Sequence, residues 1–235
     1  MKHFLDIKDC SRSELMALLT LAQELKKERR LGEFRQCMNH KHVALIFEKP
    51  SNRTRVSFEV GIRELGGNSL VLKREDVGLG DREPIKDMAR VLDRFVDAVM
   101  VRTFDHDILL QLARYSAVPI INGLTDHSHP CQALADFMTI LDHFGSFDGQ
   151  RICYLGDLNN VCRSLVEMAG ILGIEIIVSG PKTADSLDTT INYVEDPEKA
   201  IQKATVVCTD TWVSMGEEET GKNVNVFEPY QVNAQ

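Results

Sequence analysis

The sequence lacks any run of apolar residues long enough to span a membrane, and it lacks a basic-then-apolar leader at its start. It also lacks a basic excess, because the formal net charge is -8 at pH 7. A protein that binds nucleic acid or a membrane surface needs dense positive charge to neutralise phosphates. We therefore expect no nucleic-acid or membrane partner and a cytoplasmic location.

The six cysteines include no CxxC pair, so the sequence gives no sign of a disulfide framework. Glycines are also scarce at the turn LGDLNNV, where Gly156 stands alone. A dinucleotide-binding turn needs several glycines at that place. We expect buried reduced thiols and no nicotinamide cofactor.

The chain has 235 residues. In its first part, short apolar runs alternate with segments of helical periodicity. An opening amphipathic helix is predicted over residues 13–29. The predicted buried strands are 43–47, 69–72, 98–101 and 118–121, and the helices between and after them are 56–65, 108–115 and 130–144. This alternation is typical of a parallel sheet.

The pattern restarts after Gly145, in the segment GSFDGQ. Strands are predicted at 151–155, 175–178 and 205–208, helices at 161–172 and 197–203, and an exposed loop between Ser179 and Ile191. We predict an α/β fold of two doubly wound parallel-sheet domains, residues 1–146 and 147–235. The second domain is expected to be incomplete at its C-terminal end.

The segment FEKPSNRTRVSFE joins the first strand of this sheet to a helix that opens at residues 51–55. A helix N-terminus presents unpaired N–H groups that attract anions. Ser51 and Thr54 add hydroxyl donors, while Arg53 and Arg55 add guanidinium groups that suit bidentate phosphate contacts. The alternative to a phosphate site is a purely structural role, in which Ser51 caps the helix and the arginines are solvated. Cations at that end of a helix, however, oppose the helix dipole.

The segment TDHSHPCQ follows the strand predicted at 118–121. There His129 can donate to a carbonyl oxygen, and Gln132 can bond an amide-like group from the same side. His127, His129 and Cys131 also suggest zinc, but structural zinc sites usually draw ligands from two separated pairs, so a capping role for His129 is preferred. Arg102 ends the strand at 98–101, at the same predicted sheet edge, where a lone arginine is usually surface.

Two further turns follow strands of the second domain. LGDLNNVCRSL places Asp157, Asn159 and Asn160 between a strand and a helix, either as contacts for a small polar ligand or as turn and cap residues. TDTWVSMGEEE places Asp210 beside a tight turn, where a carboxylate can hold a substrate ammonium group.

Taken together, these motifs resemble the aspartate/ornithine carbamoyltransferase superfamily over about residues 4–235. SNRTRVSFE resembles the carbamoyl phosphate signature of the family, with Asn52 in place of the usual threonine. By this resemblance carbamoyl phosphate is bound by eight residues, with Thr54, Arg102 and His129 acting in catalysis. These residues are Ser51, Asn52, Arg53, Thr54, Arg55, Arg102, His129 and Gln132.

The second half resembles the ornithine branch of the family through NN at 159–160 and DTWVSMG at 210–216. That resemblance implies that Asn160, Asp210, Ser214 and Met215 bind L-ornithine. The sequence departs from the family pattern in three places: the chain stops at Gln235, before the family's HCLP segment, the loop after Val178 is short, and Gly78 stands where a loop glutamine is common.

The resemblance implies transfer of a carbamoyl group from carbamoyl phosphate to the side-chain amine of ornithine, which yields citrulline and phosphate in arginine metabolism. The resemblance implies no metal or organic cofactor. It does imply a homotrimer, in which a loop near residues 76–83 reaches a neighbouring subunit. Two alternatives stay open. One is a non-catalytic relative that retains anion binding or assembly, and the other is a carbamoyltransferase for another amine such as putrescine.

Overall fold

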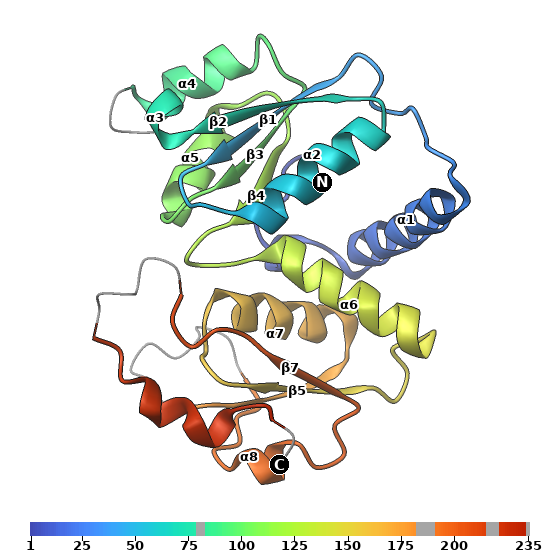
Figure 1. The fold of residues 1–235 in the computed structure, drawn as a ribbon, viewed down its shortest axis with the longest axis vertical. Helices are drawn as coiled ribbons and strands as arrows, with labels where there is room; N and C mark the ends of the chain where they lie inside the picture. The colour runs from blue at the N-terminus through green and yellow to red at the C-terminus, as the bar shows by residue number, and fades with distance from the viewer. Residues whose placement is uncertain (79–82, 182–190, 215–220, 234–235) are drawn as a thin grey trace. The chain divides into compact units, whose positions relative to one another are not determined.

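The computed structural model describes residues 1–78, 83–181, 191–214 and 221–233. The chain divides into two compact units, residues 1–134 and 135–235, and the division falls inside helix α6 (Pro130–Phe144) (Figure 1). The domain boundary that the sequence predicts at 146–147 stays a prediction. Within the described ranges, no helix is both long and apolar enough to cross a bilayer.

Unit 1 contains a parallel sheet in the strand order β2-β1-β3-β4. Its strands are β1 (His42–Phe47), β2 (Asn68–Lys73), β3 (Ala98–Arg102) and β4 (Ile120–Leu124). Its helices are η1 (Ile7–Asp9), α1 (Arg12–Leu31), α2 (Asn52–Glu64), α3 (Arg74–Val77), α4 (Ile85–Leu92) and α5 (His106–Tyr115).

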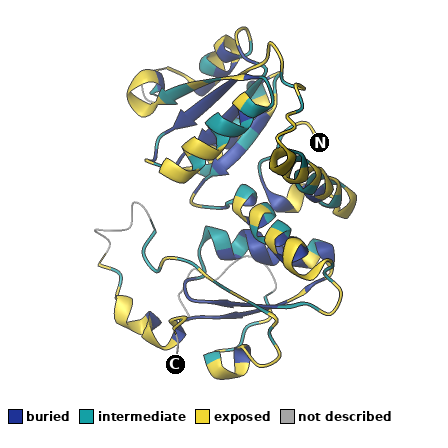
Figure 2. Cartoon of the chain, turned by 45° about the vertical axis from the view of Figure 1, so that its right-hand side comes forward, coloured by how far each residue is buried: buried dark blue, intermediate teal, exposed yellow. Residues whose placement is uncertain are grey.

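Helices cover both faces of this sheet because alternate strand residues are buried on opposite sides. On one face, Ala44 and Ile46 of β1 pack with Leu92 of α4 and Leu109 of α5. On the other face, alternate residues of β1 pack with Ile62 of α2. In Figure 2 the central strands β1 and β3 are mostly dark blue, the colour of buried residues. This confirms the doubly wound arrangement.

The N-terminal segment extends the sheet beyond β4. Phe4 forms an isolated parallel bridge with Ile121, and its N–H donates to the carbonyl of Ile120 at 2.8 Å. Two residues later, Asp6 caps η1 by accepting a hydrogen bond from the N–H of Ile7. The edge strand is thereby covered, and the start of the chain is fixed beside the carboxyl end of β4.

Unit 2 contains a parallel sheet in the strand order β6-β5-β7. Its elements are β5 (Arg151–Leu155), α7 (Asn160–Leu172), β6 (Glu175–Ser179), α8 (Pro197–Ala200), β7 (Val206–Thr209) and η2 (Val224–Tyr230). Ala200 of α8 packs with Cys153, Leu155 and Ile177. The prediction of an α/β fold with two parallel sheets is confirmed.

Two predicted elements need correction. The strand predicted at 118–121 runs from Ile120 to Leu124, because the carboxylate of Asp93 accepts the N–H groups of residues 117 and 118 and holds them in a turn. The helix predicted at 197–203 ends at Ala200, and a hydrogen-bonded turn follows it. Most of the predicted loop between β6 and α8, residues 182–190, lies outside the described residues, and Tyr193 then pairs with Val178.

Candidate functional site

The predicted phosphate-binding segment begins where β1 ends, beside the end of β3. Phe47 pairs with Arg102 in the register of these two strands, so the loop after β1 starts next to the Arg102 backbone. Parallel strands that end together bring their following loops to one edge of the sheet. This edge is where the sequence predicts that ligands bind in unit 1.

The first turn of α2 follows the loop after β1, and the partial positive charge of this helix end is not neutralised by an acidic residue of the turn. Ser51 is the N-cap residue, but its side chain accepts no hydrogen bond from the helix, and the first turn contains no acidic residue. The N–H groups of a first helical turn have no partner within the helix, and the helix dipole adds partial positive charge. The side chain of Ser51 therefore does not cap α2, as the alternative of a helix cap followed by solvated arginines would require.

Arg102 is the last residue of β3 and is buried, with 7% of its surface exposed. Its Nη1 lies 3.4 Å from the hydroxyl oxygen of Thr54 in α2. Desolvation lowers the pKa of Arg102 from its ordinary value, and the charge of Arg53 lowers this pKa further. Arg53, Thr54 and Arg102 therefore come together, and the expectation that a lone arginine at a strand end lies on the surface is wrong here.

His129 lies directly before α6 and is close enough to Arg102 to feel its charge. Burial lowers the pKa of His129 to about 4, and the positive charge of Arg102 contributes to this shift. The imidazole is consequently neutral near pH 7 and can donate one hydrogen bond. Gln132 lies in the first turn of α6, with its backbone N–H bonded to the carbonyl of His129 at 3.1 Å.

Arg55 is paired with a carboxylate of its own helix in the structure. Its Nε donates to Glu59 Oε1 at 2.6 Å, one turn further along α2, and the arginine side chain is about half exposed. A role for Arg55 in binding an anion requires exchange of this carboxylate for the ligand. Asn52 opens α2 and is exposed.

Two side-chain pairs that the sequence analysis misses join the loops around these residues. Thr103 donates a short hydrogen bond to Glu48, which links the ends of β3 and β1. The buried ammonium of Lys49 pairs with Asp126 beyond β4 and lies 4.1 Å from the ring centroid of Phe104. The only sequence signal for them is their position directly after three parallel strands.

The histidines of TDHSHPCQ do not gather as a zinc set with Cys131. In the described part of the chain, the group of potential metal ligands that contains His127 consists of Asp6, His106 and His127. Cys131 instead donates from its thiol to the backbone carbonyl of Asn122, with Sγ 3.3 Å from the oxygen. Burial of the thiol raises the pKa of Cys131 to about 12, which makes it a poor nucleophile and metal ligand near pH 7.

In unit 2, Asn159 connects the turn after β5 to the turn after β7. Its Oδ1 accepts hydrogen bonds from the backbone N–H groups of Val161 and Cys162, which caps α7. Its Nδ2 donates to Asp210 Oδ2 at 3.0 Å. The cap function that the sequence offers for this turn is confirmed for Asn159, whereas contact with a small polar ligand stays a prediction.

Of the other residues predicted to bind the amino acid, Asn160 is the first residue of α7, and its carbonyl accepts from the Ser164 hydroxyl at 3.1 Å. Ser214 follows β7 and is half-buried, while Met215 lies outside the described residues. Asp157 is buried and pairs with Lys222 Nζ at 2.7 Å, a contact that the sequence analysis did not foresee.

Comparisons with known proteins match both halves of the chain to one family. Residues 2–142 match the model of the aspartate/ornithine carbamoyltransferase carbamoyl-P binding domain. Residues 148–235 match the model of the aspartate/ornithine carbamoyltransferase Asp/Orn binding domain. The two models together take in almost the whole sequence.

Similar full-length proteins agree with the family models. The chain is 43% identical to an ornithine carbamoyltransferase of Archaeoglobus fulgidus, covering 99% of this chain and 80% of that protein. It is 45% identical to one of Methanospirillum hungatei, covering 100% of this chain and 81% of that protein. All of these relatives are longer than the chain.

A solved structure of an ornithine carbamoyltransferase from Pyrococcus furiosus superposes with a TM-score of 0.94 at 40% identity, covering 99% of this chain and 79% of that one. A Thermus thermophilus ornithine carbamoyltransferase gives a TM-score of 0.89 at 38% identity, covering 100% and 80%. The chain therefore belongs to the aspartate/ornithine carbamoyltransferase family and is a carbamoyltransferase.

Proposed function

We propose that this protein transfers the carbamoyl group of carbamoyl phosphate to the side-chain amine of L-ornithine, giving L-citrulline and phosphate. The observation that carries the proposal is the group formed by Arg53, Thr54, Arg102 and His129 at the start of α2. Relatives named ornithine carbamoyltransferase support the choice of acceptor.

The phosphate group is assigned to the first turn of α2. Ser51, Asn52 and Arg53 supply N–H, hydroxyl and guanidinium donors to a dianion, and Arg55 joins them when it releases Glu59. Charge-assisted hydrogen bonds of this type are about twice as strong as neutral ones. The buried Arg102 adds a positive charge that burial has already desolvated.

The carbonyl oxygen of the carbamoyl group is assigned to Thr54, Arg102 and His129. The amine nitrogen attacks the carbamoyl carbon, and negative charge moves to this oxygen before the bond to the phosphate oxygen breaks. Donors that are already in place stabilise this charge without reorganisation. Gln132, one turn into α6, is assigned to the carbamoyl NH2 group.

The amino acid is assigned to unit 2, where Asn160, Asp210, Ser214 and Met215 are the proposed ligands. Asn159 holds the Asp210 carboxylate by one oxygen, which leaves the second oxygen for the ammonium group of ornithine that does not react. An alkyl ammonium has a pKa of about 10.4, so the attacking amine must lose its proton on binding. A cationic, partly desolvated site favours this loss.

The proposal is tested by measuring citrulline formation by the 235-residue chain alongside carbamoyl phosphate binding by calorimetry. We expect citrulline to form with ornithine, and N-carbamoylputrescine to form more slowly when putrescine replaces ornithine as the acceptor. Binding of carbamoyl phosphate without any product would favour the non-catalytic alternative. Absence of carbamoyl phosphate binding would contradict the assignment of unit 1.

A further inference from the structure

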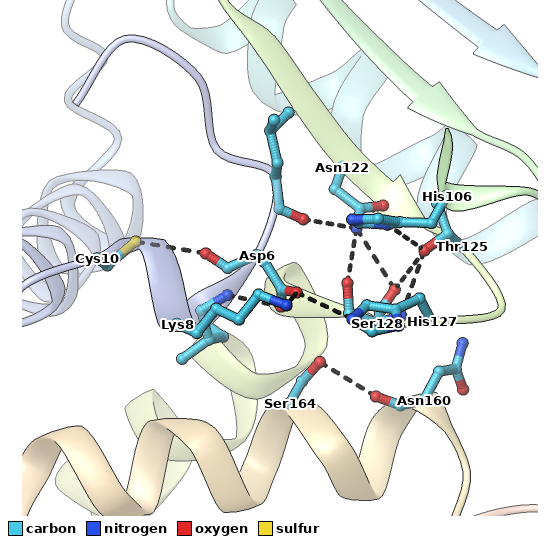
Figure 3. A network of polar contacts seen from close by, with 12 residues as sticks. Asp6, Lys8, Cys10, His106, Asn122, Thr125, His127, Ser128, Asn160 and Ser164 are labelled. Atoms are coloured by element: carbon cyan, nitrogen blue, oxygen red, sulfur yellow. Dashed lines mark hydrogen bonds and ion pairs between the residues drawn. The ribbon is translucent and has the colours of Figure 1, made fainter. Parts of the chain in front are cut away.

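Three potential metal ligands meet beside the carboxyl end of β4, although they are far apart in the sequence. Asp6 precedes η1, His106 is the first residue of α5, and His127 lies in the turn between β4 and α6. One ligand atom from each lies within 4.8 Å of the other two. Figure 3 shows Asp6, His106 and His127 in one polar network.

Asp6 provides a buried negative charge, with 1% of its surface exposed. Its Oδ1 accepts a hydrogen bond from the N–H of Ile7 at 2.9 Å, whereas Oδ2 accepts none among the described residues. Lys8 Nζ and His127 Nε2 each lie 3.4 Å from Oδ2. A buried carboxylate oxygen in this state favours the approach of a cation.

The two histidines provide nitrogen atoms on the same side of this carboxylate. Their ring centroids are 4.7 Å apart, with the planes tilted by 40°. Nδ1 of His106 is 2.9 Å from the hydroxyl oxygen of Thr125, which fixes the orientation of the ring. Metal-binding imidazoles commonly have such a contact on the nitrogen that does not bind the metal. Nε2 is thus the nitrogen that His106 offers to an ion.

We propose that Asp6, His106 and His127 bind a divalent transition-metal ion of the zinc class. Two imidazoles and one carboxylate form a donor set that zinc accepts with an open fourth position. Ligand atoms about 2.0–2.1 Å from a tetrahedral ion lie roughly 3.4 Å apart, which is the separation of Asp6 Oδ2 and His127 Nε2. The His106 ligand atom lies within 4.8 Å of the other two, so a small shift that keeps the Thr125 contact completes the set.

Lys8 competes with the ion for Asp6. Its ammonium lies 3.4 Å from Oδ2, but 55% of the lysine side chain is exposed, so it can move into solvent. Bound metal would connect the N-terminal segment to the turn that precedes α6. None of the three ligands is among the residues that we assign to carbamoyl phosphate.

The site is tested with the full chain, Zn²⁺ calorimetry and the visible spectrum of bound Co²⁺. We expect one ion per chain and a Co²⁺ spectrum of nitrogen and oxygen ligands without a thiolate charge-transfer band. His127→Gln should weaken Zn²⁺ binding by roughly 100-fold, because loss of an outer contact alone costs 10- to 100-fold. Lys8→Met should tighten binding.

His143→Gln is the matched control, since His143 is an exposed histidine at the end of α6. Retained carbamoyl phosphate binding by His127→Gln and His106→Gln would show that the variants are folded. Equal Zn²⁺ affinity in wild type and both ligand variants, a thiolate band with Co²⁺, or no binding of either ion would each overturn the proposal.

Discussion

The guanidinium of Arg102 lies against the hydroxyl of Thr54, with 3.4 Å between Nη1 and Oγ1. This contact joins the end of β3 to the first turn of α2, and the two residues are 48 positions apart in the sequence. It places a buried guanidinium beside a positive helix end, an arrangement that attracts negative charge. The family's anionic substrate, carbamoyl phosphate, supplies that charge in our proposal.

The pairing of Lys49 with Asp126 should stabilise unit 1. In Lys49→Met the methionine retains apolar packing against Phe104 but loses the ionic contact, so we expect a loss of about 1–3 kcal/mol in the free energy of unfolding. Urea denaturation measures this change. Lys41→Met removes an exposed pair with Asp97 and should cost at most about 1 kcal/mol. Equal losses in the two variants would contradict the account.

Cys131 should resist alkylation in the native protein although it lies in the HPCQ segment. Burial raises the pKa of its thiol to about 12, so only about one molecule in ten thousand carries the reactive thiolate at pH 8. Cys37 is exposed and should react first with N-ethylmaleimide. Mass spectrometry locates the label, and the urea-unfolded chain provides the control in which Cys131 also reacts. Native labelling of Cys131 as fast as Cys37 would refute burial.

Asn159 combines a helix cap with a contact to Asp210, and two substitutions separate these roles. Asn159→Ser retains a cap oxygen but loses the donor to Asp210, whereas Asn159→Ala loses both. We expect Asn159→Ala to be less stable than Asn159→Ser by about 1 kcal/mol.

Both Asn159 variants should raise the KM for ornithine without changing the KM for carbamoyl phosphate, because Asp210 loses its hydrogen-bonded partner. Steady-state kinetics with each substrate varied in turn measures the two constants. An unchanged KM for ornithine in both variants would remove Asp210 from the proposed amino-acid site.

The sequence predicts elements well where burial alone determines them. The strands β1, β3 and β5 are apolar runs, and their predicted positions agree with the structure to within a residue or two. The prediction for β4 is displaced because this strand contains Asn122, a fully buried polar residue that bonds Leu5 and Ser128. A strand predicted from a run of apolar residues therefore ends before Asn122.

The sequence also predicts which loops contain the candidate site but not how their side chains pair. The arginines of the SNRTR segment look alike in sequence, yet Arg53 lies near Arg102 while Arg55 bonds Glu59. The cluster of Asp6, His106 and His127 forms only when three distant segments meet at β4. The spacing and periodicity of residues within one segment contain no information about such long-range contacts.

The central claim, that the start of α2 binds a phosphate dianion, is tested most directly by carbamoyl phosphate calorimetry on Arg53→Ala beside Arg63→Ala. Arg63 lies exposed in the last turn of the same helix, so its removal should leave affinity unchanged. Loss of Arg53 removes charge-assisted hydrogen bonds of about 1.5–3 kcal/mol, so we expect affinity to fall roughly 10- to 100-fold. Equal affinity in the two variants would contradict the account.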